Sequence, residues 1–130
     1  MIPLFKTHFS IGRSILRIND IDRICTDNKI EDVFIVEDSM TGFPEAFRSF
    51  GGRLKFGLRV SIYNDDENEE SESKVLAFAD GDEGCKDLYK LHTESFSKKL
   101  KTPWFDYDNL KFAIPFYDSF LHKNLTSFAN

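Results

Sequence analysis

The stretch Val33–Tyr63 constrains the fold of this chain more than any other part of it. It opens with Val33–Val36, an apolar run of mostly β-branched residues that is typical of a strand buried on both faces. Pro44 favours the start of a helix, and Gly51 together with the glycine after it favours its end. Leu54–Tyr63 then alternates apolar and polar residues, which predicts a strand with one buried face. This order predicts a βαβ unit.

The rest of the chain continues the alternation of strands and helices, which favours an α/β fold with a mostly parallel sheet or barrel. The further expected elements are a strand at Leu4–Phe9, a helix from Asn19 or Asp20 to Asp27, a strand at Lys74–Ala79, a turn at Asp80–Gly84, a helix to about Phe96, a strand at Phe112–Phe116 and a helix at Ser119–Phe128. The apolar stripe expected on the helix that ends near Phe96 consists of Cys85, Leu88, Tyr89, His92 and Phe96.

Length and composition favour one ordinary globular domain over residues 1–130. The net charge of −5 is concentrated in Asn64–Ser73, which holds six acidic residues and no basic one and predicts a solvated loop. The remainder is close to neutral, so direct nucleic-acid binding has little support. No apolar run reaches the ~20 residues of a membrane helix, and Met1–Phe5 lacks the pattern of a signal peptide. We therefore expect a cytoplasmic protein without a membrane partner.

Glu37 and Asp38 follow the buried strand directly, at the end where α/β proteins gather ligands and catalytic groups. Two interpretations stay open for them, a cation site or capping of the next helix. Cys25 and Cys85 are far apart and lack the spacing of a zinc site, so we expect buried free thiols. His8 is either a metal ligand or a structural residue at the end of a strand.

Four segments in this order resemble the start of the PHP domain (polymerase and histidinol phosphatase) of bacterial DNA polymerase III alpha subunits. That family opens with a strand bearing metal-binding histidines and a following His-Ser, continues with a strand that ends in Thr-Asp-His-Gly-Asn, and then has a strand with Ile-Gly-x-Glu. A further strand and helix follow in the family, and Gly84 and Leu88 are in register with the pattern of that segment. The resemblance covers Leu4–Ser95, and its segments here are FKTHFSIGRSIL, VFIVEDSMTGFPEAFRSF, KFGLRVSIY and KVLAFADGDEGCKDLYKLHTES.

The resemblance implies a partial or reduced PHP-type distorted (β/α) barrel and an eroded set of metal ligands. His8 matches the second histidine of the first motif, whereas Lys6 holds the place of the first. Glu37 or Asp38 stands for the aspartate, and no histidine follows it. Arg59 stands where the family has a glutamate, and we expect it to pair with Glu37 or Asp38 in place of the lost metal. The chain is about half the length of a polymerase PHP domain, which suits a phage or a fragmented gene.

We therefore expect a catalytically degenerate PHP-like domain with a structural or protein-interaction role in DNA replication, without a cofactor and without enzymatic activity. Its expected partner is a polymerase or replisome protein, or a second copy. The alternative is a metal-dependent phosphoesterase, with Mn or Zn held by His8, Glu37 and Asp38 in a rearranged or partner-completed site. Trp104, Phe105 and Tyr107 form an aromatic cluster that either anchors against the core or faces a partner as in a small adaptor.

Overall fold

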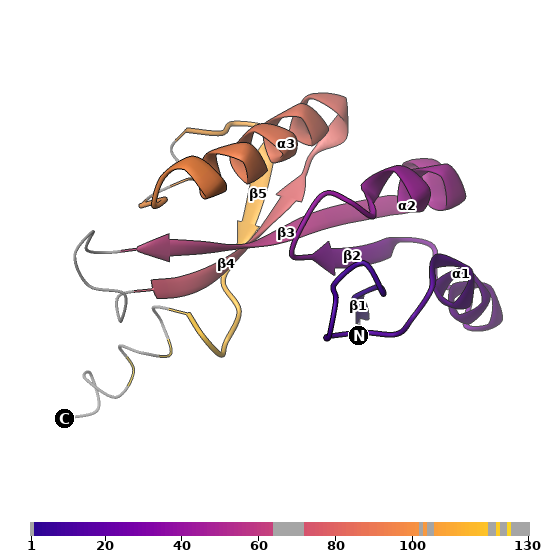
Figure 1. Ribbon diagram of the computed structural model, residues 1–130. Helices are drawn as coiled ribbons and strands as arrows, with labels where there is room; N and C mark the ends of the chain where they lie inside the picture. Colours follow the sequence, from indigo (N-terminus) through magenta and orange to yellow (C-terminus); the bar gives the residue numbers. More distant parts are fainter. Residues whose placement is uncertain are drawn as a thin grey trace. The chain divides into compact units, whose positions relative to one another are not determined.

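The computed structural model describes residues 2–63, 72–101, 103, 106–119, 122 and 125. Within them the chain is α/β, with five strands that are hydrogen-bonded in chain order from β1 to β5 and with three α-helices (Figure 1). The chain divides into two compact units, Met1–Leu58 and Arg59–Asn130, and the boundary falls inside β3. The expected α/β fold is thus confirmed at the level of class.

The first unit is a parallel arrangement. β1 (Leu4–Phe5) pairs in parallel with β2 (Val33–Glu37), and β2 pairs in parallel with β3 (Leu54–Tyr63), so that Val33 lies opposite Leu54. Between the strands lie α1 (Ile18–Asp27), α2 (Phe43–Phe50) and the short 3-10 helix η1 (Gly51–Arg53), and the two α-helices contact each other. The core of this unit consists of Ile18, Ile21, Cys25, Val33, Ile35, Val36, Met40, Ala46, Phe50, Phe56 and Leu58.

The ends of α1 follow from local hydrogen bonding. Asp20 accepts a hydrogen bond from the backbone N–H of Arg17 at 3.0 Å, half of the reciprocal capping pattern at helix starts. At the other end, the N–H of Ile30 donates to the carbonyl of Cys25 at 2.8 Å, across Lys29 with φ 55°. This is a Schellman ending, in which glycine normally occupies the left-handed position. The chain then turns directly into β2.

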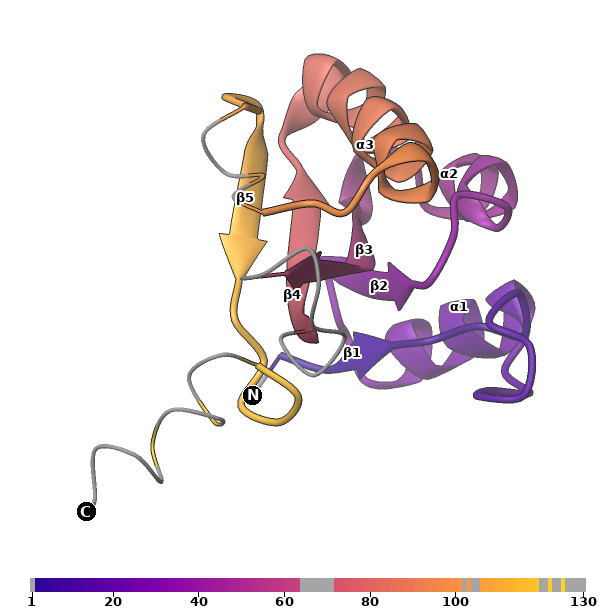
Figure 2. The ribbon, with the colours of Figure 1, turned by 60° about the vertical axis from the view of Figure 1, so that its left-hand side comes forward.

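The second unit contains the rest of β3, β4 (Glu72–Ala79), α3 (Gly81–Ser97) and β5 (Leu110–Ala113). α3 lies against β4 and β5, as both views show (Figures 1 and 2). β4 and β5 are antiparallel, with Ala79 opposite Leu110. α3 has 17 residues and carries the chain back along β4 by ~26 Å, at 1.5 Å per residue. An extended chain of the length of residues 98–109 can span the same distance in the opposite sense. β5 therefore begins beside the end of β4, and the expected parallel order does not extend to this pair.

Most expected elements are present, with boundaries shifted at the ends. β3 has the expected bounds, whereas the first strand is only Leu4–Phe5 and the fifth ends before Pro115. α3 begins at Gly81, because the acids expected in a turn form its first helical turn after the N-cap Asp80. Most of the last expected helix, Ser119–Phe128, and most of the acidic segment lie outside the described residues.

The apolar stripe expected on α3 is wrong in part. The buried residues are Gly84, Leu88 and Leu91, at the i, i+4, i+7 spacing of one helix face. Tyr89 and Phe96 are exposed instead. Gly84 is required at this face because a Cβ there would lie 2.6 Å from the carbonyl oxygen of Asn109. The close approach of α3 to the chain before β5 thus sets the rotation of the helix.

Candidate site at the carboxyl ends of β1 and β2

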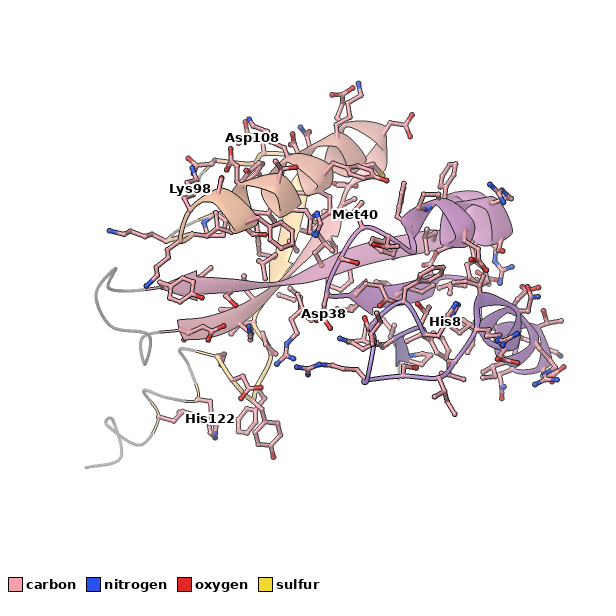
Figure 3. All side chains as sticks on the ribbon, in the orientation of Figure 1. His8, Asp38, Met40, Lys98, Asp108 and His122 are labelled. Atoms are coloured by element: carbon pink, nitrogen blue, oxygen red, sulfur yellow. The ribbon has the colours of Figure 1, made fainter. Side chains whose placement is uncertain are left out.

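Three charged residues meet where β1 and β2 end. The two strands are parallel, so their carboxyl ends lie at the same edge of the sheet. Lys6 follows β1 directly, Glu37 is the last residue of β2, and Asp38 comes next. Figure 3 shows Asp38 at the end of β2 and His8 on the segment that follows β1.

Glu37 is buried, with 1% of its surface exposed. Its Oε1 accepts a hydrogen bond from the backbone N–H of Thr7 at 2.7 Å, and its Oε2 accepts one from the hydroxyl of Ser10. Side chains alternate along a strand, so Glu37 points to the same face as the buried Val33 and Ile35. The carboxylate therefore fastens the segment after β1 to the end of β2.

Asp38 is half-exposed and is bound by cations of the chain itself. The ammonium of Lys6 lies 3.2 Å from both carboxylate oxygens, and Nε of Arg13 lies 3.8 Å from Oδ2. The hydroxyl of Ser14 donates to the carbonyl of Lys6 at 2.6 Å, which holds the Lys6 backbone in place. The negative charge of Asp38 is thus neutralised within the first unit.

His8 does not join the two carboxylates in a metal site. His8 is exposed, its ring lies tilted by 34° against the ring of Phe9 with 4.3 Å between the centroids, and its Nδ1 lies 3.4 Å from the carbonyl oxygen of Leu16. Across the described residues, no group of three or more His, Cys, Asp or Glu side chains is arranged to hold a metal ion. The donor set does not fit a divalent ion, because the ammonium of Lys6 already lies against Asp38.

The capping interpretation of Glu37 and Asp38 is wrong. Neither carboxylate caps the following helix: the N-cap of α2 is Gly42, which makes no side-chain capping bond, and Glu37 and Asp38 bind the segment after β1 instead. The expected pair of Arg59 with Glu37 or Asp38 stays a prediction, because Arg59 belongs to the second unit. Within that unit its guanidinium donates to Asp118 at 2.8 Å.

The aromatic cluster is only partly described, since Trp104 and Phe105 lie outside the described residues. Tyr107 is 3% exposed, and its hydroxyl donates to a carboxylate oxygen of Glu94. Burial, followed by this hydrogen bond, raises the pKa of Tyr107, and the same bond lowers the pKa of Glu94. Tyr107 therefore belongs to the core of the second unit, and the partner-facing patch stays a prediction for Trp104 and Phe105.

Thr7, Ser10 and Arg13 are the site residues that sequence reasoning missed. Thr7 acts through its backbone, and no residue pattern marks a backbone donor of this kind. Ser10 and Arg13 lie in a segment without periodicity, where sequence analysis assigns only a loop. The sequence signal for this segment is the presence of two aliphatic residues, Ile11 and Ile15, in an expected loop.

Comparison with known proteins adds no relative: no protein-family model and no curated protein matches this chain. No helix in the described part of the chain combines the length and the apolar composition that a bilayer span requires. The candidate site consists of a buried carboxylate that anchors a loop and an exposed carboxylate paired with an ammonium.

Proposed function

We propose that this chain is a catalytically degenerate PHP-like domain, a reduced form of the distorted barrel, with a structural or protein-interaction role in DNA replication. The proposal rests on the order of the four family-like segments and on one contact, the ion pair between Lys6 and Asp38. A polymerase or replisome protein is the partner that the resemblance suggests.

The ion pair supports loss of the metal chemistry. By the resemblance, Lys6 replaces a histidine ligand, and Glu37 or Asp38 keeps the place of an aspartate ligand; only Asp38 lies against the ammonium of Lys6. A lysine ammonium carries a positive charge to the carboxylate, but it has no open coordination position and cannot activate a water molecule as a divalent ion does. The contact can keep the two strand ends together without any hydrolytic function.

Metal binding by the purified chain tests the proposal. Elemental analysis and titration calorimetry with Mn²⁺ and Zn²⁺ should find no stoichiometric metal in the wild type. Lys6→His restores the histidine that the resemblance implies and should gain metal affinity, which Lys6→His combined with Asp38→Asn should lose again. Lys86→His is the matched control, because Lys86 is an exposed lysine paired with Glu83 far along the chain in α3.

Stoichiometric metal in the wild type that disappears in His8→Ala would overturn the proposal. Metal-stimulated release of phosphate from a phosphoester by the same protein would then favour the phosphoesterase alternative. The second result matters because metal binding alone does not establish catalysis.

A further inference from the structure

The segment from Lys6 to Arg17, here called the β1–α1 loop, is fastened to the first unit at several points. Glu37 holds its first turn through Thr7 and Ser10. The ring of Phe9 packs on Gly42 so closely that a Cβ there would lie 2.7 Å from it. The N–H of His8 donates to the carbonyl of Leu16 at 2.8 Å and closes the base of the loop. The conformation of the loop is therefore fixed from within the unit.

The fixed loop presents two aliphatic side chains to solvent. Ile11 and Ile15 are each 93% exposed, the highest values among the exposed large apolar residues of the described chain. Gly12, with φ 75°, turns the chain between them. A single exposed aliphatic residue is ordinary, but two that are almost fully exposed within five residues of one anchored loop indicate a binding segment. Loops held by a rigid scaffold are also where binding residues concentrate.

The charge of the loop indicates the chemistry of a partner. Arg13 and Arg17 flank Ile15, and residues 7–17 contain no acidic residue. Asp38 lies closer to Lys6 than to Arg13, and the side chain of Arg13 is 59% exposed. The side chain of Arg17 makes no ion pair with any residue in the described part of the chain. The loop is thus apolar and basic, and its complement is apolar and acidic.

We propose that the β1–α1 loop binds, through Ile11 and Ile15, a segment of a partner protein in which large apolar side chains stand beside carboxylates. The inference rests on the proposed interaction role and names the surface that performs it. A protein fits better than the other anionic partners. A nucleic-acid backbone offers no apolar side chains, and a bilayer surface does not require a loop whose conformation is fixed through Glu37 and Phe9.

Selection from a display library of random dodecapeptides tests the proposal. The full wild-type chain is the bait, and the double variant Ile11→Ser/Ile15→Ser is used for counter-selection. The expected peptides combine Asp or Glu with large apolar residues. By fluorescence anisotropy, the double variant should bind a synthetic version at least tenfold more weakly, and Arg13→Gln should bind it about threefold more weakly.

Ile2→Ser/Ile114→Ser is the matched control, since these isoleucines are also exposed but lie outside the loop. It should bind like the wild type, and circular dichroism must show all variants folded. Selected peptides that bind the counter-selection variant equally well would overturn the proposal, as would a selection that yields none. Loop-dependent binding of phosphatidylserine vesicles or of a single-stranded oligonucleotide, without peptide binding, would overturn it in favour of those partners. Metal binding is measured separately, so failure of the docking proposal and failure of the degenerate-domain proposal give different results.

Discussion

Replacement of Glu37 tests whether the buried carboxylate holds the first unit together. Glu37→Ala leaves the N–H of Thr7 and the hydroxyl of Ser10 without their acceptor inside the protein. An unsatisfied buried donor costs about 1–3 kcal/mol. The Ser10 hydroxyl can rotate toward another acceptor, whereas the Thr7 N–H is fixed, and the truncation also leaves a cavity. We expect a loss of about 3 kcal/mol in the free energy of unfolding, after allowing for the desolvation of a carboxylate that the variant no longer buries.

Glu37→Gln separates hydrogen bonding from the presence of the side chain. Its carbonyl oxygen can still accept from Thr7, and its amide can donate to Ser10 if that hydroxyl turns. The loss should stay near 1 kcal/mol. Asp38→Asn is the control, because Asp38 is 42% exposed and surface ion pairs contribute only about 0–1 kcal/mol.

Urea denaturation followed by circular dichroism measures these differences. With a slope of about 2 kcal/mol per molar urea, the expected loss in Glu37→Ala moves the midpoint by about 1.5 M. Hydrogen exchange at the Thr7 amide provides a local measurement and should be much faster in the same variant. Unfolding of Glu37→Ala within about 0.5 kcal/mol of the wild type, with Thr7 still protected, would show that the anchoring argument is wrong.

Three further predictions concern stability elsewhere in the chain. Gly84→Ala should lower the free energy of unfolding by about 1–3 kcal/mol, because its Cβ would lie 2.6 Å from the carbonyl oxygen of Asn109, even though a helix interior usually favours alanine over glycine. Gly52→Ala is the control and should change the melting temperature little, since no atom lies within 4 Å of its Cβ. Lys29→Gly should stabilise by about 0.5–1 kcal/mol by removing the strain of φ 55°, a gain that Lys29→Ala should not show in the same melts. Burial lowers the pKa of His92 in the folded chain, so the unfolded chain binds a proton on this imidazole first, and stability should fall as the pH drops below ~6.5. His92→Phe should reduce the difference in melting temperature between pH 5 and pH 7. An undiminished difference would contradict the assignment of this pH dependence to His92.

The sequence predicts the fold best where periodicity and chain breakers agree. β3 has its expected bounds because ten residues alternate strictly, and α2 lies between a proline and two glycines. The direction of β5 could not be predicted, because it depends on how far residues 98–109 carry the chain after α3. The rotation of α3 about its axis could not be predicted either, since it depends on the contact of Gly84 with the backbone carbonyl of Asn109, which is distant in sequence.

The two adjacent carboxylates illustrate what a strand pattern can still resolve. The apolar run before Glu37 and Asp38 does not distinguish the two residues, because it is apolar on both faces and does not show which face is more deeply buried. The alternation of side chains nevertheless aligns Glu37 with Val33 and Ile35, so the glutamate enters the interior and finds Thr7 and Ser10. Asp38, one residue further, has left the strand and lies half-exposed. Of the two, Asp38 is accessible to an ion or ligand, and the ammonium of Lys6 already lies against it. Any gain of metal binding in the first unit should therefore depend on Asp38 and on replacement of Lys6, while Glu37 governs stability.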